Sequence, residues 1–167
     1  MVVPEHMIES INALQQNMFI NAPTISQTAA LKCWDDDTIA ELEQHVTKYR
    51  TSRILLLEEL DKISGLTLSP ADGGFYIYAH MGPDCVHLDG SGSGQFGAVE
   101  FCKSLLEDEK VAITPGIDFE DPSTDLGHRR FRISYAGGID TAKEAMERLH
   151  RFWPVWLEKV KAAKAEN

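Results

Sequence analysis

Residues 127–138, GHRRFRISYAGG, contain the pattern that decides the fold. From Arg130 to Tyr135 polar and apolar residues alternate, and such alternation is typical of a β-strand with one covered face. We therefore expect a strand whose two faces differ in character. The core face would carry Phe131, Ile133 and Tyr135, and the opposite face would carry Arg130, Arg132 and Ser134.

Three arginines stand within four positions of this stretch, in a chain whose formal net charge is -10. In one interpretation they lie on a wet face and are solvated or paired with some of the 26 acidic residues. In the other, the strand holds the planar guanidinium of Arg132 rigidly, so that it binds a carboxylate with two parallel hydrogen bonds. The spacing alone leaves both interpretations open.

The composition narrows the class of protein. A chain of 167 residues fits one domain, or one and a part, and its 43% apolar residues can bury a core. A pI of about 5.0 argues against a nucleic-acid partner. No apolar run approaches the ~20 residues needed to span a bilayer, and the first ten residues lack the features of a secretory signal. The three cysteines have no C-x-x-C spacing, which suits a reducing compartment, so we expect a cytoplasmic protein.

Helices are predicted throughout the first part of the chain. Apolar residues at helical spacing indicate one helix over residues 4–17, and a shorter one follows, capped by Thr24 or Asn21. Residues 35–63 show the strongest helical pattern, about 28 residues long, where the average helix has about 11–12. Long helices often bridge two bodies, so we expect a connecting helix that ends at Ser64–Gly65.

Strands and helices alternate in the second part of the chain. Strands are predicted over residues 73–81, 110–116 and 129–136, and helices over residues 95–109 and from residue 140 onward. Asp140 is expected to cap the last helix, and Pro154 is expected to kink or interrupt it. The sequence therefore predicts an α+β protein with a small sheet, helices packed on it and a long helix leading in.

Three segments, GGFYIY (73–78), VAITPGIDF (111–119) and FRISYA (131–136), follow each other in an order that resembles the C-terminal part of class I/II aminotransferases. These are fold-type I enzymes that depend on pyridoxal phosphate, and the resemblance runs from residue 1 to about residue 153. It implies a small, mostly antiparallel sheet covered by helices. It also implies three parts: residues 1–34 as a remnant of the large cofactor domain, 35–63 as the connecting helix and 64–167 as the small C-terminal domain.

The resemblance assigns roles to a few residues. Arg132 matches the arginine that binds the substrate's α-carboxylate, whereas Arg129 and Arg130 match no such residue. Asn21 and Thr24 lie in NAPT, which resembles the segment near the cofactor phosphate of the partner subunit; the alternative is a simple helix cap. Gly116, in the turn TPG, is expected where the backbone passes close to other atoms, or in an ordinary strand-ending turn.

The resemblance also implies what this chain does not supply. The lysine that forms the Schiff base with pyridoxal phosphate lies, in the family, in a Ser-rich segment shortly before the part that this chain resembles. No lysine of this sequence stands in such a context, so no catalytic residue is expected here and the chain alone should not transaminate. In the intact enzyme, expected to be a homodimer, the substrates would be an amino acid and a 2-oxo acid.

Other interpretations remain beside this one. The chain could be a non-catalytic, truncated relative that pairs with a full-length subunit. GSGQFG (92–97) matches a dinucleotide-binding pattern but follows a long loop rather than a strand. His80, Cys85 and His87 lie close in sequence but fit no closed zinc pattern, so no metal site is expected.

Separated from a large domain, residues 1–3 and 7–31 should expose apolar surface that favours self-association.

Overall fold

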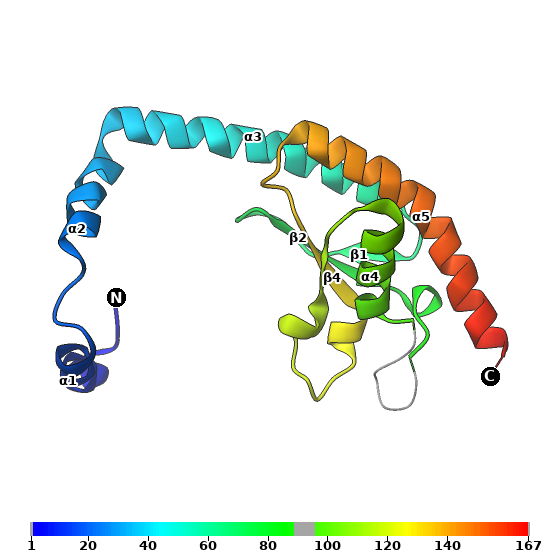
Figure 1. Ribbon diagram of the computed structural model, residues 1–167, viewed down its shortest axis with the longest axis horizontal. Helices are drawn as coiled ribbons and strands as arrows, with labels where there is room; N and C mark the ends of the chain where they lie inside the picture. The colour runs from blue at the N-terminus through cyan, green and yellow to red at the C-terminus, as the bar shows by residue number, and fades with distance from the viewer. Residues whose placement is uncertain (1, 89–95, 167) are drawn as a thin grey trace. The chain divides into compact units, whose positions relative to one another are not determined.

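The computed structural model describes residues 2–88 and 96–166, and its contacts divide the chain into two units, Met1–His45 and Val46–Asn167. Over residues 2–45 the first unit is built from helices and turns (Figure 1). These are η1 (Glu5–Met7), α1 (Ile8–Met18), α2 (Thr24–Ala30), η2 (Leu31–Trp34) and the beginning of α3 (Asp36–Asp61). The helices predicted over residues 4–17 and 35–63 are confirmed within one or two residues at most ends.

The predicted cap of α2 is wrong. Pro23 is the N-cap residue, no side chain caps the helix, and Thr24 is already the first helical residue. The Pro23 carbonyl accepts a hydrogen bond from the backbone amide of Gln27 at 3.1 Å, which closes the first helical turn. Because the proline ring restricts φ to a value near that of a helix, the chain can begin the helix here without help from Asn21.

The second unit contains a four-stranded antiparallel sheet and two further long helices. Its elements are β1 (Leu66–Leu68), β2 (Tyr76–Met81), η3 (Pro83–Cys85), α4 (Ala98–Glu109), β3 (Thr114–Pro115), η4 (Gly116–Asp118), η5 (Leu126–His128), β4 (Arg130–Ser134) and α5 (Ile139–Ala165). The strand order is β1-β2-β4-β3, so β2 and β4 form the centre of the sheet. The predicted α+β class, with a small antiparallel sheet covered by helices, is confirmed.

Several local predictions need correction. The sequence did not indicate β1, and β3 is reduced from residues 110–116 to two residues at the edge of the sheet. The N-cap of α5 is Gly138 at φ 90° rather than Asp140, which lies in the first turn. The helix also continues through Pro154 without interruption.

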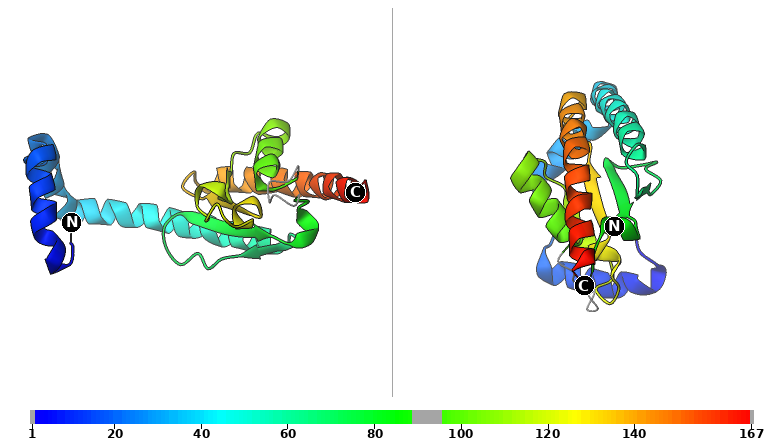
Figure 2. Two further views of the ribbon diagram at one scale, coloured as in Figure 1. Left: turned by 90° about the horizontal axis from the view of Figure 1, so that it is seen from below. Right: turned by 90° about the vertical axis from the view of Figure 1, so that its right-hand side faces the viewer.

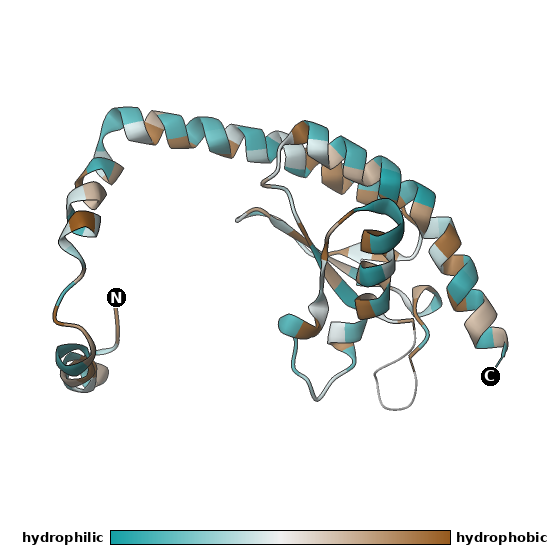
Figure 3. Ribbon diagram, viewed as in Figure 1, coloured by the Kyte–Doolittle hydropathy of each residue, from teal (hydrophilic) through white to brown (hydrophobic). Residues whose placement is uncertain are grey.

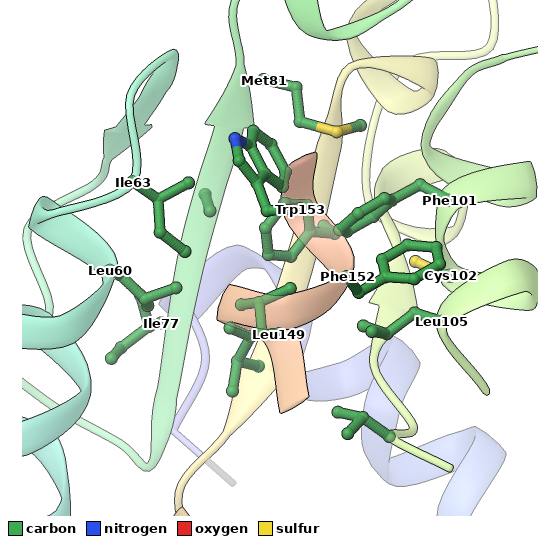
Figure 4. Packing of buried hydrophobic residues seen from close by; sticks show 14 of the residues in the cluster. Leu60, Ile63, Ile77, Met81, Phe101, Cys102, Leu105, Leu149, Phe152 and Trp153 are labelled. Atoms are coloured by element: carbon green, nitrogen blue, oxygen red, sulfur yellow. The ribbon is translucent and has the colours of Figure 1, made fainter. Parts of the chain in front are cut away.

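One face of the sheet forms the core. The core residues of the two central strands are paired across the sheet, Ile77 with Ile133 and Ala79 with Phe131. Helices α4 and α5 pack against each other (Figure 2), and their side chains meet the sheet together with those of the last turns of α3 (Figure 4). The Phe101 ring lies at the centre of this core, with its centroid 5.2 Å from those of both Phe131 and Trp156.

The first unit buries none of its described residues. From residue 2 to residue 45 every side chain is exposed or half-exposed. Many of these side chains are apolar, as the hydropathy colouring of α1 and α2 shows (Figure 3). The large exposed ones are Val2, Met7, Ile8, Leu14, Met18, Phe19, Ile20, Ile25, Leu31, Trp34, Ile39 and Leu42. The predicted exposure of apolar surface around residues 7–31 is therefore confirmed.

None of the helices in the described ranges combines the length and the apolar character needed to cross a bilayer.

Candidate functional site

The face of the sheet opposite the core, the open face, is polar and accessible. Arg132 lies near its middle, because β4 pairs with β2 on one side and with β3 on the other. The residue opposite Arg132 is Tyr78 on β2 and Thr114 on β3. Phe131 and Ile133, the neighbours of Arg132 in sequence, are buried on the core side. The alternation predicted for this strand is confirmed, and it aims Arg132 away from the core.

The guanidinium of Arg132 contacts two aromatic rings. Its Cζ atom lies over the ring of Tyr76, 4.1 Å from the centroid, and over the ring of Phe119, 4.2 Å from the centroid. Within residues 2–88 and 96–166, Arg132 has no carboxylate partner. A guanidinium that contacts aromatic rings by its faces keeps its in-plane N–H donors available for an anion.

The two neighbouring arginines are paired with acidic residues. Arg129 binds Asp125, with Nε 2.7 Å from Oδ2, and Arg130 binds Glu120, with Nη1 2.7 Å from Oε1. The interpretation of these arginines as charges balanced by acidic residues therefore holds for Arg129 and Arg130. Arg132 differs from both, because its positive charge is left unbalanced on the open face.

Glu120 connects the loop after η4 to the sheet. Its Oε1 atom accepts hydrogen bonds from the Tyr78 hydroxyl at 2.8 Å and from Arg130. The hydrogen bond from Arg130, followed by that from Tyr78, holds the pKa of Glu120 below its ordinary value. Burial, followed by the hydrogen bond to Glu120, raises the pKa of Tyr78 to about 12. At neutral pH this group of residues is therefore an ionised carboxylate, a neutral phenol and a paired guanidinium.

His80 lies further along the same face, opposite Arg130, beside a hollow of about 250 Å³ that also touches Thr67 and Ser69. Burial, followed by the positive charges of Arg130 and Arg129, lowers the pKa of His80. The imidazole is therefore neutral at pH 7 and adds no charge to the open face.

Gly116 allows this arrangement by its lack of a side chain. A Cβ atom there would lie 2.8 Å from the Tyr78 hydroxyl oxygen and 2.9 Å from the carbonyl oxygens of both Arg130 and Gly127. The predicted close approach of the backbone at Gly116 is confirmed. The glycine lets η4 lie directly against β4 and η5, which places Phe119 and Glu120 beside the sheet.

Residues 1–149 match the family of class I and II aminotransferases. The chain belongs to this family. It is 35% identical over 148 residues to (5-formylfuran-3-yl)methyl phosphate transaminase of Methanocaldococcus jannaschii, covering 89% of this chain and 35% of that protein. It is 34% identical over 154 residues to valine–pyruvate aminotransferase of Mycobacterium tuberculosis, covering 92% of this chain and 36% of that protein. The crystal structure of an aminotransferase from Mycobacterium tuberculosis matches with a TM-score of 0.76 and 33% identity, covering 92% of this chain and 36% of that one. The chain thus spans about a third of the length of these aminotransferases.

Asn21 and Thr24, the residues expected near the cofactor phosphate, belong to the first unit, whereas Arg132 belongs to the second. Both side chains are exposed. Neither forms a side-chain hydrogen bond within the described residues, so the Asn21 amide and the Thr24 hydroxyl are available to an outside acceptor.

The lysines of this aminotransferase chain are all exposed. Some make local contacts, such as Lys110 with the Glu107 carbonyl at 2.7 Å and Lys32 with Asp35 at 2.7 Å.

The other motifs of the sequence can be followed only in the described parts of the chain. No cluster of His, Cys, Asp and Glu there could hold a metal ion. Cys85 is buried beside Gly65, with its thiol 3.6 Å from the Gly65 carbonyl oxygen. Most of the GSGQFG motif, residues 92–95, and Asp89 lie outside the described residues.

Sequence reasoning missed Tyr76, Phe119 and Glu120. From the sequence, Tyr76 is expected only as a strand residue, Phe119 only as the end of the segment VAITPGIDF, and Glu120 has no expected role. The signal that could have found Tyr76 is the strand pattern itself, because residues 76, 78 and 80 must share the face opposite Ile77. No local pattern indicates that Phe119 reaches Arg132.

Proposed function

We propose that this chain is the C-terminal part of a pyridoxal-phosphate-dependent aminotransferase, which exchanges an amino group between an amino acid and a 2-oxo acid. In this proposal Arg132 binds the α-carboxylate of the substrate. The observation that carries it is the unbalanced guanidinium of Arg132 on the open face of the sheet, beside two arginines that are both paired. The family membership of the chain agrees with this role.

The open face suits a carboxylate for a physical reason. Two parallel hydrogen bonds from a guanidinium to a carboxylate are charge-assisted and directional, and each bond to a charged group contributes about 1.5–3 kcal/mol. Glu120 is the nearby acidic competitor, and it is already bound to Arg130 and Tyr78. Arg132 can therefore bind a substrate carboxylate without first releasing one of its own.

Pyridoxal phosphate would supply the electron sink of the reaction. Of the residues in this chain, Asn21 and Thr24 fit a contact with its phosphate, because both carry free donors; in our proposal they face the cofactor of the partner subunit in a homodimer. The lysine and the carboxylate that the cofactor requires would come from the remaining length seen in the relatives. Residues 1–34 would belong to the large cofactor domain, 35–63 would connect the domains, and 64–167 would form the small domain.

The experiment that tests the proposal compares two arginine variants in the polypeptide that joins this chain to its cofactor domain. Arg132→Gln should lower kcat/KM for the amino acid by about 30-fold or more, because losing one partner of a charged pair costs about 2–5 kcal/mol. Arg151→Gln is the matched control, since Arg151 is exposed on α5 and binds Glu109. Equal activity of both variants and the wild type would contradict the role of Arg132.

The alternative is a non-catalytic relative that pairs with a full-length subunit, and the exposed apolar residues of the first unit fit this alternative as well as the enzyme. The intact mass of the native protein separates the two. A species well above 18.6 kDa that contains these peptides would support the enzyme. A species at 18.6 kDa that co-purifies with a longer aminotransferase would support the pairing partner.

A further inference from the structure

The carboxylate-binding role proposed for Arg132 raises the question of what holds its side chain in place. Arginine has a long, rotatable side chain, and ordering it for a ligand costs conformational entropy. Among the acidic residues in the ranges 2–88 and 96–166, none fixes the guanidinium of Arg132. The contacts that remain are the two rings, Tyr76 at 4.1 Å and Phe119 at 4.2 Å from Cζ to the ring centroid.

Each ring is itself held in position. Tyr76 is the first residue of β2, in register with Ser134, and its ring lies 4.4 Å from that of Phe75. The Phe119 amide donates a hydrogen bond to the Gly116 carbonyl at 2.9 Å, and its ring meets the Tyr78 ring edge-on at 6.3 Å.

The residue after Phe119 provides a second anchor. Glu120 is bound by Tyr78 on β2 and by Arg130 on β4, so the loop that carries Phe119 is tied to both central strands. The two rings that contact Arg132 therefore come from separate elements, each of which is fixed to the sheet. Such rings attract a cation over their faces and do not compete for its in-plane donors.

We propose that Tyr76 and Phe119 form an aromatic clamp that holds the Arg132 guanidinium ready for the substrate carboxylate. They act as positioning residues, and Glu120 keeps the Phe119 side of the clamp in place. The inference rests on the proposed function, because it assumes that Arg132 binds the carboxylate. Both rings are partly exposed, Tyr76 at 38% and Phe119 at 45%, so changing them leaves the core intact.

The test uses two pairs of variants in the cofactor-containing polypeptide. Phe119→Leu and Tyr76→Leu keep apolar bulk but remove the aromatic face, whereas Phe119→Tyr and Tyr76→Phe keep it. Each Leu variant should raise KM for the amino acid about three- to tenfold with a smaller change in kcat. Each aromatic variant should keep the KM of the wild type. The increase should be absent for the corresponding amine, which lacks the carboxylate.

A second readout follows Arg132 directly in this chain. Arginine-selective NMR should show the Arg132 Nε–H resonance shifted by the two rings, and each Leu variant should move it toward the position of a solvent-exposed arginine. Unchanged KM and an unmoved resonance in the Leu variants would overturn the clamp. If Arg132→Gln also left KM unchanged, the proposed function would fail with it; if only Arg132→Gln raised KM, the clamp alone would fail.

Discussion

Replacing Gly116 by alanine should displace the groups that pack around it at the open face of the sheet. The new Cβ atom would lie 2.8–2.9 Å from three oxygen atoms, whereas ordinary van der Waals contact begins at 3.4 Å. Two of these oxygens are the backbone carbonyls of Arg130 and Gly127, which cannot rotate away as a side chain could. Overpacking of this kind costs about 1–3 kcal/mol, and we expect Gly116→Ala to lower the free energy of unfolding by that amount.

Gly73→Ala is the matched control. A Cβ atom at Gly73 has no neighbour within 4 Å, and its φ lies outside the left-handed region that favours glycine. A compatible Gly→Ala change stabilises by about 0.4–1 kcal/mol through the unfolded state. The two variants should therefore shift the midpoint of denaturant unfolding in opposite directions.

The same variant has a second, local signature. The third close atom is the Tyr78 hydroxyl oxygen, and moving it weakens the hydrogen bond to Glu120 that helps raise the pKa of Tyr78 to about 12. Titration of the phenol by near-ultraviolet absorbance should give a lower pKa in Gly116→Ala than in the wild type. If Gly116→Ala unfolded at the same denaturant concentration as Gly73→Ala, the close packing of η4 on the sheet would be refuted.

Two further predictions concern titratable side chains. The pKa of Tyr78 is raised to about 12, so the contribution of this phenol to stability should be complete below pH ~10 and lost as the pH rises from there to about 12, because the unfolded chain ionises first. The free energy of unfolding, measured across this pH range, should fall, and the fall should be smaller in Glu120→Gln. If Tyr78→Phe lost as much stability over this range as the wild type does, the assignment of the loss to the Tyr78 phenol would be contradicted. In thiol labelling of the native chain, the exposed Cys33 should react at once. Cys102 should react only on unfolding, because it is buried and burial raises its pKa to about 12. Equal labelling rates for the two cysteines would contradict the packing of α4.

The regular elements with long, clear patterns could be predicted from the sequence. Strand β4 was predicted because its alternation covers the whole strand, and α3 because its apolar spacing persists over several turns. Strand β1 was missed because three residues, Leu66–Leu68, are too few to show a period. Strand β3 was predicted too long because an apolar run suggested it, while pairing with β4 extends only over Thr114 and Pro115. Proline has no N–H to continue the ladder, which suits a strand that ends at the edge of the sheet.

The site was predictable in part. Arg132 could be placed on the open face from the pattern alone, but its distinction from Arg130 depends on Glu120, ten residues away in sequence. Phe119 reaches Arg132 only because Gly116 allows η4 to lie against the sheet. Such contacts arise from the fold of a loop rather than from a period in the sequence, and the structure is needed to find them.

The proposed function requires direct contact between Arg132 and the substrate carboxylate. The measurement that tests it is a double-perturbation cycle, which compares an amino acid with its decarboxylated amine in the wild-type enzyme and in Arg132→Gln. If the two groups interact, the cycle should yield a coupling energy of about 1.5 kcal/mol or more in kcat/KM, as close charge pairs do. A coupling energy near zero, with both substrates affected equally by the substitution, would contradict the proposed role of Arg132.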